Sequence, residues 1–64
     1  TNENLIGKEG VVFSILRLSG RIEIDGKIYD AQSVYGHIDK GEKITVIASD
    51  GIMLKVKKSI ENEN

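Results

Sequence analysis

The sequence predicts a small all-β protein, a barrel of five strands. Apolar and polar residues alternate along several short segments, which is typical of strands with one buried face. Asp-Gly pairs at 25–26 and 50–51 each separate two such segments, and Asp-Gly in this setting is a strong hairpin signal. No segment carries a helical period of useful length, and the chain contains no proline. These observations favour strands joined by tight turns over any helical arrangement.

Length and composition limit how such a barrel can be stabilised. The chain has 64 residues, enough for one domain, and contains no cysteine and only one histidine. Disulfides and a structural zinc site are therefore excluded, so a sheet closed around isoleucine, leucine and valine must supply the stability. Nine basic residues balance ten acidic ones, which provides no general attraction for a polyanion.

The chain shows neither a membrane span nor a signal peptide. No apolar run approaches the roughly 18 to 20 residues that a membrane helix needs. Residues 1–4 lack the charged-then-apolar layout of a secretion signal. We expect the chain as given to be soluble. It begins with threonine, so we interpret it as a fragment of a longer protein.

The first strand is expected at about 8–16, with Gly7 and Gly10 marking a bend or a bulge. Phe13 is expected in the core. The strand is apolar on both faces, as suits a strongly bent strand at the centre of a barrel. One face carries Val11, Phe13 and Ile15, and the other carries Val12, Ser14 and Leu16.

A hairpin is expected at 20–33, with its turn at 25–26 and with Ile22 and Ile24 facing the core. Two registers are open. A two-residue turn places Ile22 opposite Tyr29, whereas a three-residue loop with a glycine bulge places Ile22 opposite Ile28. Both registers pair opposite charges, and a slip of one residue exchanges which of Ile28 and Tyr29 is buried.

The second half of the chain reads as a connection followed by another hairpin. Alternation fails at 34–41, where Ile38 is taken as the only strongly apolar member and is expected to plug an end of the barrel. A strand follows at 42–49, and Asp50-Gly51 is expected to be a second turn of the same kind. The last strand is expected at about 52–57. Its inward residues would be Ile52, Leu54 and Val56, and its outward residues Met53, Lys55 and Lys57.

A meander of three strands, a connection and a hairpin, within about 50 residues, has the size and order of an OB-fold-like barrel. An SH3-like barrel is the second choice. A biotinyl-type barrel is discounted because both predicted hairpin tips are Asp-Gly and Lys55 lies within a strand. We expect residues 1–4 to be a polar tail or linker, 5–58 to form the barrel and 59–64 to be a polar tail.

Candidate catalytic and metal-binding residues have ordinary structural explanations. His37, near Asp39, reads as an exposed loop histidine. The serines lack a second histidine or a lysine base in a dry pocket. Asp25 and Asp50 are turn residues, which accounts for them better than a metal cluster with the other aspartates does. The sequence therefore predicts no enzyme, no catalytic residue, no metal and no cofactor.

The chain resembles the C-terminal soluble domain of the NfeD family of membrane proteins. The resemblance covers nearly all of the chain between the tails. One departure stands at Leu18, where the family usually has proline in the first loop. The segments that carry the resemblance are Leu16–Ile22, Asp25-Gly26, Tyr29–Ser33, Ile38, Lys40–Ile47, Gly51 and Leu54–Val56.

The resemblance implies a five-stranded OB-fold attached to transmembrane helices. NfeD proteins work beside stomatin-, prohibitin- and flotillin-like membrane proteins, and long members also carry a ClpP-like serine protease domain that is not in this sequence. It further implies a non-catalytic domain at the membrane surface of an anchored parent protein, with the cytoplasmic side favoured. None of the family's catalytic residues maps onto these positions, and no small-molecule substrate is expected.

A docking domain should leave an apolar patch uncovered. The candidates for partner contact are Leu16, Leu18, Tyr35 and Met53. Leu18 is the most suggestive, since a turn does not require leucine there, although it could equally fold back as a barrel plug. The alternative function is single-stranded nucleic-acid binding, which OB-folds perform with a basic groove and stacking aromatics. Few aromatic residues and interleaved charges disfavour it, so no nucleic acid is expected as a partner.

Overall fold

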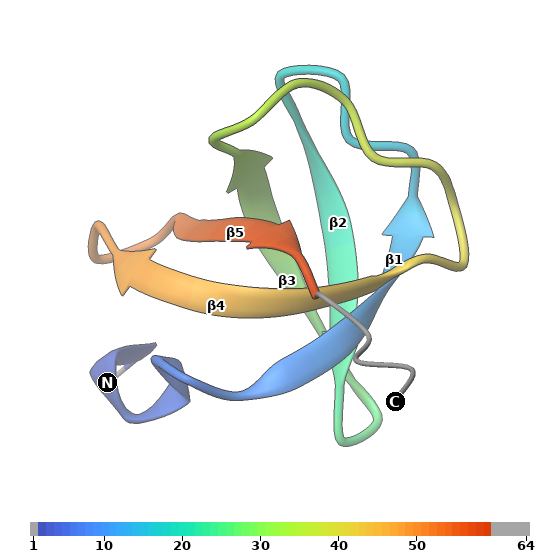
Figure 1. Ribbon diagram of the computed structural model, residues 1–64. Coiled ribbons are helices and arrows are strands. Elements are labelled where there is room, and N and C mark those ends of the chain that lie inside the picture. The colour runs from blue at the N-terminus through green and yellow to red at the C-terminus, as the bar shows by residue number, and fades with distance from the viewer. Residues whose placement is uncertain (1, 60–64) are drawn as a thin grey trace, which may run out of the picture.

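The computed structural model describes residues 2–59; of the polar tail expected at 59–64, residues 60–64 lie outside the described residues. Five strands form a closed barrel in the order β1-β2-β3-β5-β4, and β1 pairs with β4 to complete it (Figure 1). The all-β prediction is confirmed, and the barrel is consistent with a small OB-like barrel. Its strands are β1 (Glu9–Ser14), β2 (Ser19–Ile24), β3 (Lys27–Ser33), β4 (Lys43–Ser49) and β5 (Leu54–Lys58).

Aliphatic side chains fill the barrel. No polar or charged residue is buried among the described side chains. Full burial of one such aliphatic side chain contributes about 1.5–3 kcal/mol, so this core is the main source of stability. Ile38 is buried, as expected of a barrel plug. The buried residues are Val12, Leu16, Ile22, Ile24, Ala31, Ile38, Ile44, Val46, Leu54 and Val56.

The first hairpin has the two-residue turn. Asp25 and Gly26 have φ values of 53° and 84°, the left-handed pair that a type I′ turn requires. Ile22 accordingly lies opposite Tyr29. Tyr29 packs partly buried against the core, whereas Ile28 is 44% exposed on the outer face.

The first strand is shorter than expected and has only one buried face. The register of β1 against β2 shifts between Val12 and Ser14, which is a β-bulge. The bend or bulge was expected at Gly7 and Gly10, so the observed bulge lies further along the chain than predicted. Phe13 is 49% exposed, so its expected place in the core is wrong. The reason is that the barrel has a single interior, which lies on one side of β1. No second layer of described residues covers the other side of β1.

The second hairpin has a loop of four residues rather than two. Ser49 pairs with Leu54, and the Asp50 N–H donates to the Met53 C=O at 2.8 Å. β5 therefore begins at Leu54, and Ile52 lies in the loop with 87% of its surface exposed. The expectation that Ile52 points inward is wrong because the chain at 52 has not yet joined the sheet.

A 3-10 helix, η1 (Asn2–Leu5), precedes the strands and overlaps the segment 1–4 that was expected to be a polar tail or linker. The Lys8 N–H donates to the Leu5 C=O at 2.9 Å, and Leu5 packs against the core. No helix formed by residues 2–59 is long and apolar enough to cross a membrane.

Candidate partner-binding surface

Two loops that are distant in sequence are joined at one end of the barrel. The β1–β2 loop spans residues 15–18, and the β3–β4 loop spans residues 34–42. Leu16 and Ile38 exchange backbone hydrogen bonds of 2.9 and 2.8 Å, and the Ser33 N–H donates to the Leu18 C=O at 3.3 Å. Figure 1 shows the two loops running side by side beyond the ends of β1 and β3. The backbone therefore holds both loops in a fixed relative position.

A tight turn at 33–36 sets the position of Tyr35. The Ser33 hydroxyl accepts a hydrogen bond from the Tyr35 N–H at 3.3 Å and donates to the Gly36 C=O. Gly36 has a φ of 79°, a conformation that glycine adopts without steric cost. This turn leaves Tyr35 75% exposed.

The structure separates the four candidate contact residues. Leu18 is 78% exposed, so it does not fold back as a plug, and with Tyr35 it lies in the joined loops. Leu16 is fully buried and cannot contribute to an exposed patch, because its bridge to Ile38 holds it within the core. Met53 is partly buried and lies in the β4–β5 loop, outside the joined loops.

Sequence reasoning missed two further apolar residues in the joined loops, Ile15 and Val34. Each is more than one-third exposed. We call Ile15, Leu18, Val34 and Tyr35 the loop patch. Ile15 was assigned to a strand, but β1 ends at Ser14; the failure of alternation after Ser33 was the available signal for Val34. Exposed apolar residues on the loops at one end of a domain are candidates for an interaction surface.

A charged cluster fixes the far end of the β3–β4 loop. Glu42 accepts a hydrogen bond from the Asp39 N–H at 3.1 Å through Oε2, and its Oε1 lies 3.2 Å from Lys58 Nζ. The hydrogen bond from the Asp39 backbone, followed by the interaction with Lys58, lowers the pKa of Glu42 below its ordinary value of 4.5. The cluster thus attaches the loop to β5 while Glu42 is ionised.

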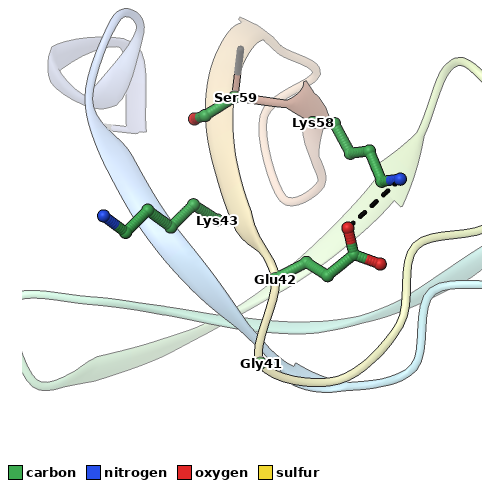
Figure 2. A pocket seen from close by; sticks show the side chains of 5 residues that line it. All are labelled: Gly41, Glu42, Lys43, Lys58 and Ser59. Carbon is green, nitrogen blue, oxygen red and sulfur yellow. Dashed lines mark ion pairs between the residues drawn. The ribbon is translucent and has the colours of Figure 1, made fainter. Parts of the chain in front are cut away.

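An open hollow of about 450 Å³ lies beside this cluster (Figure 2). Gly41, Glu42, Lys43, Lys58 and Ser59 line it. The Ser59 hydroxyl lies 2.6 Å from that of Thr45, and Glu42 is engaged with Lys58. Ser59 and the Glu42–Lys58 ion pair therefore hold strand ends together at the rim of the hollow.

His37 lies on the surface of the β3–β4 loop. Its Nε2 is 3.9 Å from Asp39 Oδ1, and both side chains are about two-thirds exposed. Among the described residues, no group of three or more histidine, cysteine, aspartate or glutamate side chains could hold a metal ion.

Comparisons with known proteins agree with a binding role. Residues 2–58 match the family described as NfeD-like C-terminal, partner-binding domain. The chain is 40% identical over 55 residues to the membrane-bound protease PH1510 of Pyrococcus horikoshii, an overlap of 84% of this chain but 12% of that protein. The name protease therefore describes a protein of which this chain matches only a small part.

Two solved structures have the same fold. One is the C-terminal domain of stomatin operon partner protein 1510-C from Pyrococcus horikoshii, with a TM-score of 0.88 and 37% identity over 92% of this chain and 94% of that chain. The other is the soluble domain of a membrane protein implicated in regulation of membrane protease activity from Corynebacterium glutamicum. It has a TM-score of 0.82 and 27% identity, covering 92% of this chain and all of that chain.

Proposed function

We propose a stomatin-docking function for this chain, which belongs to the family of NfeD-like C-terminal, partner-binding domains. The domain acts as a non-catalytic interaction module of a membrane-anchored parent protein. Its partner is a membrane protein of the stomatin, prohibitin or flotillin type. The similar domain from Pyrococcus horikoshii belongs to a stomatin operon partner protein, and this supports the choice of partner.

The observation that carries the proposal is the loop patch. Leu18 and Tyr35 are each at least three-quarters exposed, yet both belong to loops held by backbone hydrogen bonds. Because the backbone of these loops is already fixed, binding orders little further backbone, so more of the energy from burying the two side chains remains as affinity. The loop patch therefore suits an apolar surface of a folded partner or of its terminal segment.

The parent protein would hold this domain close to the membrane on which the partner lies. The similar structure from Corynebacterium glutamicum is the soluble domain of a membrane protein, and this supports such an arrangement. We place the domain at the membrane surface, on the cytoplasmic side.

The first test is a pair of NMR titrations of the isotope-labelled chain. One ligand is the C-terminal segment of a stomatin-like protein from the same source, and the other is a mixed-sequence single-stranded oligonucleotide. We expect shifts centred on Leu18 and Tyr35 with the stomatin segment alone. Shifts with the oligonucleotide that weaken with added salt would replace docking with nucleic-acid binding. Silence in both titrations would contradict the proposal.

A pair of variants tests the loop patch itself. Leu18→Ser combined with Tyr35→Ser should weaken binding of the stomatin segment by at least about tenfold, as expected when two anchors of an interface are removed. Ile52→Ser is the matched control because Ile52 is also highly exposed and apolar but lies outside the loop patch. Equal weakening by the control, with native spectra for both proteins, would exclude the loop patch as the specific contact.

A further inference from the structure

The first half of β3 has a free edge on the side away from β2. β2 pairs with β3 along its length from Lys27 to Gln32. β5 pairs with β3 only at Ala31–Ser33, and Figure 1 shows β5 reaching β3 near its arrowhead half. Within residues 2–59, the segment 27–30 thus has a neighbouring strand on one side only. We call this segment the β3 edge.

The backbone of Ile28 points toward the free side. The Ser33 N–H donates to Leu18, on the β2 side, whereas the Val34 N–H donates to Val56, on the β5 side. Because these directions alternate from residue to residue along a strand, the even-numbered residues of β3 direct their N–H and C=O groups away from β2. The N–H and C=O of Ile28 therefore point to the side that β5 does not reach.

The outer face beside the β3 edge combines an apolar and an acidic residue. Ile28 is 44% exposed and lies opposite Glu23. Asp30, two residues along on the same face, has a side chain that is 67% exposed and lies 3.8 Å from Arg21. A strand added at the β3 edge would place one side chain next to Ile28 and another, two residues along, next to Asp30.

We propose that the β3 edge binds an extended segment of a partner protein by strand addition. Backbone hydrogen bonds to Ile28 supply the attachment, as in other cases where a peptide joins an exposed sheet edge. Side-chain recognition favours a segment with an apolar residue beside Ile28 and a lysine or arginine, two positions away, beside Asp30. The acidic charge of Asp30 selects the basic residue.

A second copy of this chain is the less suitable occupant. Two antiparallel β3 edges can form hydrogen bonds only where the outward-directed backbone groups of both copies face each other. The possible registers pair Ile28 with Ile28, Ile28 with Asp30, or Asp30 with Asp30 of the other copy. None of these registers offers a basic residue to Asp30. An edge of four residues also provides far less than the roughly 800 Å² per partner that a stable interface buries.

This inference goes beyond the docking function and does not depend on it. The β3 edge begins beside the turn at Asp25-Gly26, whereas the loop patch lies at the opposite end of the β2–β3 hairpin, beyond Ser33. Variants of Leu18 and Tyr35 therefore leave the β3 edge intact, and the two proposals can fail separately.

The test is an NMR titration of the labelled chain with an end-capped heptapeptide in which four threonines alternate with valine, lysine and valine. The peptide reads the same in both directions, so it can pair parallel or antiparallel. We expect amide shifts centred on Ile28 and Asp30, with slowed hydrogen exchange at the Ile28 N–H. The same peptide with N-methylated backbone amides should lose these effects.

Two substitutions separate backbone pairing from charge recognition. Ile28→Pro removes the outward N–H without removing a bond to β2 and should abolish peptide binding. Asp30→Asn should weaken binding by about two- to fivefold, the range expected for one cross-strand pair. Asp39→Asn is the matched control, because Asp39 has an equally exposed carboxylate away from the β3 edge.

Three results would overturn the proposal. The first is an absence of shifts at Ile28 in the wild-type chain at the highest concentration at which the peptide is soluble. The second is peptide binding that survives both N-methylation of the peptide and Ile28→Pro in a chain with native spectra. The third is a set of Ile28 shifts that appears on concentrating the chain alone, which would assign the β3 edge to a second copy.

Discussion

Leu16 and Ile38 face each other across an isolated antiparallel bridge, and both side chains are buried. Their two backbone hydrogen bonds join the β1–β2 loop to the middle of the β3–β4 loop. One contact thus closes an end of the barrel and fixes the two loops that carry the exposed residues Leu18 and Tyr35. Stability and the shape of the loop patch are therefore coupled at this bridge.

Ile38→Ala should lower the free energy of unfolding by about 2–5 kcal/mol, because it leaves a cavity beneath the joined loops. Denaturant unfolding followed by circular dichroism measures the change. Ile52→Ala removes an exposed side chain and should stay within about 0.5 kcal/mol of wild type. Similar losses for the two variants would contradict the role of Ile38 as a barrel plug.

Gly26→Ala should destabilise the protein by about 1–2 kcal/mol, because a Cβ atom disfavours the left-handed conformation at this turn. Gly26 has a φ of 84°, and no atom of a distant residue would obstruct an added Cβ, so the cost comes from crowding against the local backbone. Thermal and denaturant unfolding measure it. Lys27→Ala, at the adjacent exposed position, is the control, and an unchanged stability for Gly26→Ala would argue against the type I′ turn.

Glu42 should contribute stability that depends on pH. Its folded-state pKa is lowered, so the contribution is present above the unfolded pKa of the carboxyl and is lost as the pH falls through the folded-state pKa. Glu42→Gln should therefore reduce stability at neutral pH and have a smaller effect at a pH below both values. Unfolding free energies of both proteins across this range test the sign, and a difference that grows toward acid would contradict it.

Ser59→Ala should cost about 0.5–1.5 kcal/mol, the usual contribution of one hydrogen bond. The Ser59 hydroxyl lies 2.6 Å from the partly buried hydroxyl of Thr45, and the Ser59 N–H donates to the Lys43 C=O at 2.9 Å. Ser19→Ala, at an exposed position of β2, is the control. The comparison also tests the expected start of the polar tail at residue 59, since a neutral Ser59→Ala would favour that boundary.

Local sequence signals were sufficient for much of the fold. Alternation identified Ile22 and Ile24 as core residues, and the Asp-Gly pair located the first turn, because backbone preference and side-chain alternation act within a few residues. Ile38 was identified in the same way, as an apolar residue isolated in a polar connection. The resemblance of the chain to a known family indicated the partner-binding class.

The closed barrel decided which apolar residues are exposed. Phe13 and Leu16 both belong to an apolar stretch, yet Phe13 lies outside the barrel and Leu16 inside it. Ile52 and Leu18 look equally suited to a core by hydropathy but lie in loops. The physical reason is that burial depends on strand pairing and closure between distant segments. Composition and alternation determined the strands, whereas the bulge in β1 and the Leu16–Ile38 bridge determined the surface available to a partner.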